Sequence, residues 1–177
     1  MSDTRQLEAM SETAFTVELR QQADYRFEVR FDNPTLPVIV TDEPSPLGGD
    51  AGPNPARLLG AAVANCLAAS LLFALRKHKN DAEPLRAVAT VSLARNAHKR
   101  LRIERVAVDV HLGAAAEQMQ RLDRVLEQFE EFCIVTQSVR AAIEVSVRVF
   151  DSRGHLLKPA ASTSSPGERP STVAESP

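Results

Sequence analysis

The stretch "NPARLLGAAVANCLAASLLFAL", residues 54–75, decides the fold, because it reads as one helix that is apolar on nearly every side. Its start is well marked. Asn54 can cap the free backbone amides, and Pro55 suits the first helical position, where a missing N–H costs nothing. A helix without a polar face must be buried. We therefore expect a long central helix that is covered on all sides, with Cys66 at its middle.

The same helix could instead cross a membrane, since the run from 58 to 75 is about as long as the shortest membrane-spanning segments. Asn65 and Ser70 lie inside the run, no aromatic anchors flank it, and the chain has no second candidate. These features favour the core helix of a soluble protein over a membrane anchor.

The composition fits an ordinary globular protein. The chain has 177 residues and a formal net charge of -2, with mixed charges and no long runs. This length fits one domain. The charge pattern contains no basic patch of the kind that binds nucleic acid or a membrane surface. Residues 1–23 lack the basic start and apolar centre of a secretory signal, so we expect a cytoplasmic protein. In that reducing compartment the two cysteines are expected to be thiols rather than a structural disulfide.

Both ends of the chain have compositions that cannot bury enough apolar surface to offset the entropy of ordering. Residues 1–12 are polar and non-periodic, and residues 158–177 are rich in Pro, Ser, Ala and Thr. We expect disordered tails over these two ranges and a single domain over residues 13–157.

Between the tails, the two-residue repeat of strands alternates with the spacing of helices. Strands joined mostly by hairpins indicate an α+β fold rather than a parallel doubly wound sheet. The expected elements are strands at 15–20, 25–32 and 36–40, a Pro- and Gly-rich loop at 41–55, the central helix, a hairpin of strands at 85–96 and 100–113, a half-exposed helix at 114–133, a shorter helical segment at 133–143 and a strand at 143–151.

Few residues in the chain point to chemistry. No two of the four histidines have the spacing of metal ligands. The sequence also has no glycine motif for phosphate and no serine elbow for acyl transfer. Two cysteines remain, Cys66 and Cys133, each on a predicted helix. From the residues alone, burial in the core explains an unpaired cysteine more readily than reactivity does.

Two motifs resemble those of the OsmC and organic hydroperoxide resistance family. "GPNPARLLGAAVANCLAASLLFAL" (52–75) has the family's Gly-rich loop, Asn-Pro pair and Ala-rich helix with a cysteine eleven residues beyond the proline. "FCIVTQSVRAAIEVSVRV" (132–149) resembles its second cysteine motif and final strand, and the resemblance covers about residues 13–151. It implies an α+β, OsmC-like fold of antiparallel sheets with a long buried central helix, in which two chains intertwine as a homodimer.

Characterised members of that family are thiol-dependent peroxidases, so the resemblance implies an enzyme that reduces organic hydroperoxides. Cys66 then matches the peroxidatic cysteine, which becomes a sulfenic acid, and Cys133 the resolving cysteine, which condenses with it to a disulfide. The implied partners are a hydroperoxide substrate and an external dithiol, with lipoyl groups as a family-level suggestion, and no metal or organic cofactor is needed. Apolar residues would favour alkyl peroxides over hydrogen peroxide. The candidates are Leu59, Val63, Leu67 and Phe132.

A thiolate at Cys66 needs a nearby cation, because Cys66 lies about three turns inside its helix, beyond the reach of the N-terminal dipole. In characterised members an arginine supplies it, held by a glutamate directly after the Asn-Pro proline, but here Ala56 occupies that position. The candidate cations are Arg26 and Arg30, on the polar face of the second strand, and Arg57. The candidates to replace the missing carboxylate are Glu28 and Glu43.

The second motif also departs from the family pattern. Ile134 follows Cys133 where the family usually has proline, and Thr136 stands where serine is usual. Glu130 and Glu131 precede the cysteine and are expected to disfavour its thiolate, which a resolving cysteine can tolerate.

The missing glutamate motivates a second hypothesis, a non-catalytic dimer of the same fold that binds an apolar ligand or acts as a thiol redox sensor. A third is a dimeric structural module with two inert, buried cysteines. Replacing Cys66 by Ser separates the first two, because peroxide consumption would vanish while ligand binding would survive. Slow thiol labelling of the native protein would support the third.

Overall fold

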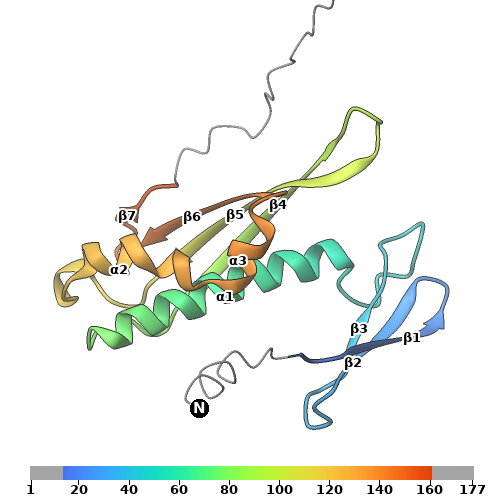
Figure 1. Cartoon of the computed structure of the whole chain (residues 1–177), viewed down its shortest axis with the longest axis horizontal. Helices are drawn as coiled ribbons and strands as arrows, with labels where there is room; N and C mark the ends of the chain where they lie inside the picture. The colour runs from blue at the N-terminus through green and yellow to red at the C-terminus, as the bar shows by residue number, and fades with distance from the viewer. Residues whose placement is uncertain (1–13, 161–177) are drawn as a thin grey trace, which may run out of the picture. The chain divides into compact units, whose positions relative to one another are not determined.

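The computed structural model describes residues 14–160, which form two compact units, 14–58 and 59–160 (Figure 1). The tail predicted over 1–12 and most of the tail predicted over 158–177 lie outside the described residues. Lys158, which the prediction placed in the second tail, is instead the last residue of a strand.

The first unit is an antiparallel sheet whose three strands, close to those predicted, follow the order β1 (Val17–Ala23), β2 (Arg26–Phe31) and β3 (Ile39–Thr41). The two-residue repeat gives the sheet an apolar face, where Leu19 lies opposite Val29, and a charged face, where Arg20 lies opposite Glu28. Val29 is buried, whereas Leu19 on the edge strand β1 is 59% exposed. The apolar face therefore leaves the side chains of β1 accessible.

The Pro- and Gly-rich loop after β3 is organised around the carboxylate of Asp42. This buried side chain accepts the backbone N–H groups of Glu43, Gly49 and Ala51 at 2.9–3.2 Å. Arg26 lies 3.8 Å from it. Burial would raise the pKa of Asp42, but these donors and Arg26 hold that pKa below its ordinary value. One ionised side chain thus fixes the shape of the loop that leads into the central helix.

The central helix, α1 (Pro55–Lys77), begins as predicted. The Asn54 side chain accepts the backbone N–H of Arg57 at 3.1 Å, and proline occupies the first helical position. The last turn contains Arg76 and Lys77, whose charges suit the negative end of the helix dipole. The boundary between the two units lies in the first turn of α1.

The second unit contains a sheet whose strands follow the order β4 (Arg86–Arg95), β5 (Leu101–His111), β6 (Glu144–Phe150) and β7 (Leu156–Lys158). The predicted β4–β5 hairpin is confirmed. The expectation of purely antiparallel sheets is wrong, because β5 and β6 run parallel. Parallel neighbours need a crossover connection, which the helical segments between them provide. β7 was not predicted, since it borders the Pro- and Ser-rich end of the chain.

The helix predicted over 114–133 is wrong as a single element. Arg121 has a left-handed backbone, with a φ of 53°, and interrupts it. The apolar spacing survives the break, since Val125 and Phe129 both face the core. The shorter helical segment predicted at 133–143 is present. The four pieces, with η for a 3-10 helix, are η1 (Ala116–Gln118), α2 (Leu122–Gln128), η2 (Phe129–Phe132) and α3 (Ile134–Val139).

In the second unit, α1 covers one face of the sheet, and α2 and α3 lie beside it (Figure 1). Gly60 permits the close approach, because a Cβ there would lie 2.6 Å from Cγ2 of Val91 on β4. The core fills the space between helix and sheet. Its members on α1 and the sheet include Val63, Leu67, Leu71, Leu75, Val106, Val108, Val110, Val147 and Val149.

The prediction that α1 is buried on all sides is wrong for the single chain. Its buried residues follow helical spacing along one face. Ala62, Asn65, Ala69 and Phe73 are exposed along the opposite face, and Phe73 is 64% exposed. A helix that covers one sheet buries only one side, so the apolar character of the second side requires another partner.

By length and hydropathy α1 could span a membrane, although 44% of its apolar 18-residue window is buried inside the structure. The core helix of a soluble protein passes the same test. The close packing of α1 against β4 is the behaviour of a core helix.

Asn80 joins the end of α1 to the segment before α2. Its buried side chain donates to the Gln120 backbone oxygen at 2.9 Å and accepts the Gln120 backbone N–H at 2.7 Å. Asn80→Ala leaves both backbone groups without partners, so we expect the free energy of unfolding to fall by about 1–3 kcal/mol. Denaturant unfolding measures this. Glu127→Ala, at an exposed position of α2, is the control, and an equal loss in both variants would contradict the prediction.

Candidate active site

The structure brings the two cysteines together within the second unit. Cys66 lies at the middle of α1 and is partly accessible, and Cys133 lies between η2 and α3 and is fully buried. Both are free thiols, and they lie close enough together for Cys66 to affect the pKa of Cys133. Two residues far apart in the sequence thus form one dithiol.

Burial raises the pKa of the Cys133 thiol, and the neighbouring Cys66 thiol raises it further. Thr136 acts in the opposite direction. Its side-chain oxygen lies 3.0 Å from the Cys133 sulfur, and its hydroxyl and backbone N–H both lower the pKa, without cancelling the rise. At neutral pH Cys133 is therefore a protonated thiol, with a hydroxyl beside it that can stabilise the anion.

The Cys133 thiolate is disfavoured, as predicted, but Glu130 is not the cause, because its carboxylate is already paired. One of its oxygens accepts from Arg140 at 3.0 Å, and the other lies 3.1 Å from Nζ of Lys158. Lys158 also donates to the Leu126 backbone oxygen at 2.9 Å. Desolvation, rather than repulsion from the glutamates, is the main reason for the raised pKa of Cys133.

Backbone hydrogen bonds also fix the segment that carries Cys133. The backbone N–H of Cys133 donates to the Glu130 carbonyl at 3.1 Å, and the Cys133 carbonyl accepts the N–H of Gln137 at 2.9 Å. The Lys158 ammonium lies 5.7 Å from the ring centre of the fully buried Phe129. One lysine of β7 therefore holds α2 and η2, the two short helices that precede the cysteine.

Arg26 and Arg30 lie on the charged face of the first unit's sheet, where each has a carboxylate partner. Arg26 pairs with Asp42 at 3.8 Å, and Arg30 pairs with Glu28 at 2.7 Å. Glu28, one of the two carboxylates predicted to replace the missing glutamate, thus pairs with Arg30. Both arginines belong to the other unit from the cysteines, so their contact with the Cys66 thiol stays a prediction.

The second predicted carboxylate, Glu43, has a different partner. It accepts the side-chain N–H of Asn54 at 3.3 Å, so it steadies the residue that caps α1. Arg57, the third candidate cation, is exposed and donates its backbone N–H to that cap.

Two of the four apolar residues predicted to select alkyl peroxides lie in the core. Val63 and Leu67 are fully buried, so they support the helix rather than contact a ligand. Leu59 is half-buried, and Phe132, which precedes Cys133, is 58% exposed. Phe132 is therefore the accessible member of this set beside the thiols.

Two contacts at the cysteine segment were not assigned from the sequence. Thr136 follows Cys133 by three positions, and this helical spacing could have placed both on one side. Lys158 gave no comparable signal, because it borders a Pro- and Ser-rich stretch and contacts residues about thirty positions earlier.

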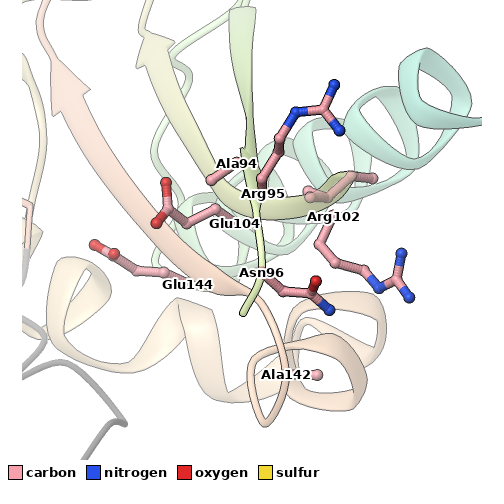
Figure 2. A pocket seen from close by; sticks show the side chains of 8 residues that line it. Ala94, Arg95, Asn96, Arg102, Glu104, Ala142 and Glu144 are labelled. Atoms are coloured by element: carbon pink, nitrogen blue, oxygen red, sulfur yellow. The ribbon is translucent and has the colours of Figure 1, made fainter. Parts of the chain in front are cut away.

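A hollow of about 360 Å³ lies at the β4–β5 hairpin (Figure 2), and no cysteine lines it. In Figure 2 the guanidinium groups of Arg95 and Arg102 point in the opposite direction from the carboxylates of Glu104 and Glu144. A ligand site needs polar groups that converge on one point. This hollow is therefore a weaker candidate than the dithiol.

Within residues 14–160, no three side chains of His, Cys, Asp or Glu lie close enough together to hold a metal ion. Two of the histidines make structural contacts instead. Nδ1 of His155 lies 3.2 Å from the buried carboxylate of Asp151, and His111 stacks on Phe150.

Cys66 should react first with a thiol reagent in the native protein, because Cys133 is fully buried. N-ethylmaleimide labelling followed by peptide mass spectrometry measures both rates. Lys158→Met removes the contacts of that lysine with Glu130, the Leu126 carbonyl and the Phe129 ring, so the labelling rate of Cys133 should rise by about threefold or more. Lys99→Met, in the exposed β4–β5 turn, is the matched control. Equal labelling rates of the two cysteines in the unaltered protein would contradict the prediction.

A comparison with curated proteins by sequence found no match. Solved structures match in fold. They include an OsmC-like protein of unknown function from Vibrio cholerae (17% identity, TM-score 0.66, 78% of this chain and 99% of that chain), an organic hydroperoxide resistance protein from Elizabethkingia anophelis (21%, 0.60, 78% and 98%) and the organic hydroperoxide resistance protein OhrB of Bacillus subtilis (18%, 0.59, 78% and 99%). The predicted α+β, OsmC-like fold is confirmed.

The family model described as OsmC-like protein matches residues 48–148, which is more than half of the 177 residues. That span contains the end of the Gly-rich loop, all of α1 and both cysteines. The chain therefore belongs to the OsmC-like family.

Proposed function

We propose that this protein is a thiol-dependent peroxidase that reduces organic hydroperoxides with Cys66 and Cys133 as a redox pair. The observation that carries the proposal is the proximity of the two free thiols inside one unit. Membership of the OsmC-like family supports it, as does the fold shared with proteins named for organic hydroperoxide resistance.

In the first step, the Cys66 thiolate attacks the distal oxygen of the hydroperoxide. The O–O bond breaks, the sulfur becomes a sulfenic acid, and the alkoxide takes up a proton and leaves as an alcohol. Cys66 suits this role because it is the more accessible of the two thiols.

In the second step, the Cys133 sulfur attacks the sulfur of the Cys66 sulfenic acid. A disulfide forms, and the departing hydroxide combines with the thiol proton to give water. The two thiols already lie close together, so this step needs little rearrangement. An external dithiol then restores both thiols by exchange and is itself oxidised to a disulfide.

We also propose that Arg26 or Arg30 supplies the cation that stabilises the Cys66 thiolate. Both arginines have carboxylate partners that orient them, Asp42 and Glu28. Such a pair would take over the task of the family glutamate that Ala56 replaces.

Accessible aromatic side chains support an organic rather than an inorganic peroxide. Phe73 and Phe132 are 64% and 58% exposed and line one small hollow of about 50 Å³ between α1 and α2; neither cysteine lines it, but Phe132 directly precedes Cys133. Burying an alkyl group against them is favourable, and hydrogen peroxide has no such group to bury.

A homodimer is the second part of the proposal. The exposed face of α1, formed by Ala62, Asn65, Ala69 and Phe73, is mostly apolar and is not covered by the second unit itself. Exposed apolar patches of this kind mark interaction surfaces, and symmetric dimers are the commonest assemblies. A second copy of the chain is the occupant that the family resemblance favours.

Light scattering after size exclusion should give about twice the chain mass of 19.3 kDa. Ala69→Glu puts a charge at the centre of the exposed face, so the dimer dissociation constant should rise by about tenfold or more. Gln118→Glu, on the exposed side of η1, is the control. A monomeric wild-type protein at micromolar concentration would contradict the dimer.

Mixing the reduced protein with one equivalent of cumene hydroperoxide should remove both free thiols and lower the intact mass by about 2 Da, the signature of an intramolecular disulfide. Cys66→Ser should abolish peroxide consumption. Cys133→Ser should consume peroxide but stop at a sulfenic acid, which dimedone traps. Unchanged thiols over minutes would overturn the peroxidase proposal and favour an apolar-ligand binder or redox sensor.

The same assay identifies the cation. Whichever of Arg26→Ala and Arg30→Ala slows sulfenic acid formation by about tenfold marks the arginine that stabilises the thiolate. Arg102→Ala, on the β4–β5 hairpin, is the control for loss of a surface charge. Wild-type rates in both variants would exclude both arginines.

A further inference from the structure

The Thr136 hydroxyl is fully buried and has a single partner. Its oxygen lies 3.0 Å from the Cys133 sulfur, and it makes no other hydrogen bond within residues 14–160. A hydroxyl can accept from a thiol and, after rotation about its C–O bond, donate to a thiolate. The pair can therefore follow a change in the charge of the sulfur without any backbone movement.

The backbone of α3 sets this geometry. Cys133 immediately precedes the helix, and Thr136 lies three positions later, so both side chains face the same side. The Cys133 carbonyl accepts the N–H of Gln137, and the Thr136 carbonyl accepts the N–H of Arg140 at 3.0 Å. The hydroxyl is held at the sulfur by the first turn of the helix.

Few charged groups reach the Cys133 sulfur. Cys66 on α1 is the titratable group that faces it directly. In η2 the Glu130 carboxylate is paired with Arg140 of α3 and Lys158 of β7, while Glu131 is exposed. Among the described residues, Thr136 thus provides the groups that offset the burial of a Cys133 anion.

We propose that Thr136 is a positioning residue that holds the Cys133 sulfur against Cys66 and donates a hydrogen bond to the Cys133 thiolate whenever that thiolate forms. The inference rests on the proposed redox pairing of the two cysteines.

The thiolate forms twice in the cycle. During disulfide formation, Cys133 gives up its proton and its sulfur attacks the sulfur of modified Cys66. During reduction, the thiolate of the external dithiol attacks Cys66, the more accessible sulfur; the S–S bond breaks and its electron pair goes to Cys133. The same hydroxyl therefore assists Cys133 as a nucleophile and as a leaving group.

Ellman's reagent, 5,5′-dithiobis(2-nitrobenzoate), isolates this step without a peroxide. A first release of thionitrobenzoate reports attack by Cys66. A second release, independent of reagent concentration, reports attack of Cys133 on the mixed disulfide at Cys66. Thr136→Val should leave the first phase unchanged and slow the second about tenfold, the effect of losing one hydrogen bond to a charged atom. The pH midpoint of the second phase should rise by about one unit.

Thr136→Ser keeps the hydroxyl and should stay within about twofold of the wild-type second-phase rate. Because Thr136 is buried, Thr136→Ala gives a second variant without the hydroxyl should Thr136→Val fold poorly, and denaturant unfolding checks each variant. A merely structural role would not move the pH midpoint. Equal second-phase rates and equal pH midpoints for the Ser variant and a hydroxyl-free variant would overturn the assignment.

The experiment also separates this inference from the proposed function. Two phases with Ellman's reagent but no reaction with cumene hydroperoxide would overturn the peroxidase proposal. In that case a slower second phase in Thr136→Val would still support the role of Thr136. Release of only one thionitrobenzoate from the wild-type protein would overturn the Thr136 role, since Cys133 would then not attack Cys66.

Discussion

The packing of α1 against one face of the β4–β7 sheet is the constraint on which the second unit depends. Gly60 lets the helix approach β4 closely, and Leu67 is fully buried in the resulting core. Cys66 precedes Leu67 by one position, so it lies at the edge of the buried face and remains partly accessible. The sheet thus fixes the position of α1 along its axis and its rotation about that axis. These two together decide where the Cys66 thiol reaches the surface.

The second cysteine depends on how the chain crosses between β5 and β6. A crossover built as one long helix would carry its residues past α1 at a fixed angle. The break at Arg121 and the change from η2 to α3 let the chain turn, and Cys133 lies at that turn, where it meets Cys66. Lys158 of β7 then ties the turn to the sheet through Glu130. The last strand is short, but its contacts hold the segment that makes the dithiol possible.

Local signals predicted the elements that depend on local physics. The Asn54 cap, the two-residue repeat of the β4–β5 hairpin and the apolar run of α1 were all readable, because each reflects neighbouring residues. The left-handed Arg121, the pairing of Glu130 and the strand that ends at Lys158 were not, because each is decided by contacts between distant parts of the chain. β7 in particular consists of three residues whose extended form is stabilised by β6.

The candidate site was predictable in a different sense. Periodicity placed Cys66 and Cys133 on helices and left burial as the simplest explanation of both. Their pairing was an implication of the family resemblance, and the structure supports it by placing them close together. The apolar pattern could not show that one side of α1 would remain exposed, since a residue such as Ala69 is equally suited to a core and to a dimer interface.

The unequal burial of the two thiols sets an order on any chemistry that they share. A fully buried Cys133 with a raised pKa is protected from direct attack by an oxidant, because the thiolate is the reactive form and neither solvent nor reagent reaches it. Any oxidation of the pair would therefore begin at Cys66. The same burial means that Cys133 must lose its proton in an apolar setting before it can react with Cys66. The neutral hydroxyl of Thr136 beside the sulfur can stabilise the resulting thiolate without adding a permanent charge to the core. A lysine in the same place would lower the pKa further, but it would also make the buried cysteine reactive too early.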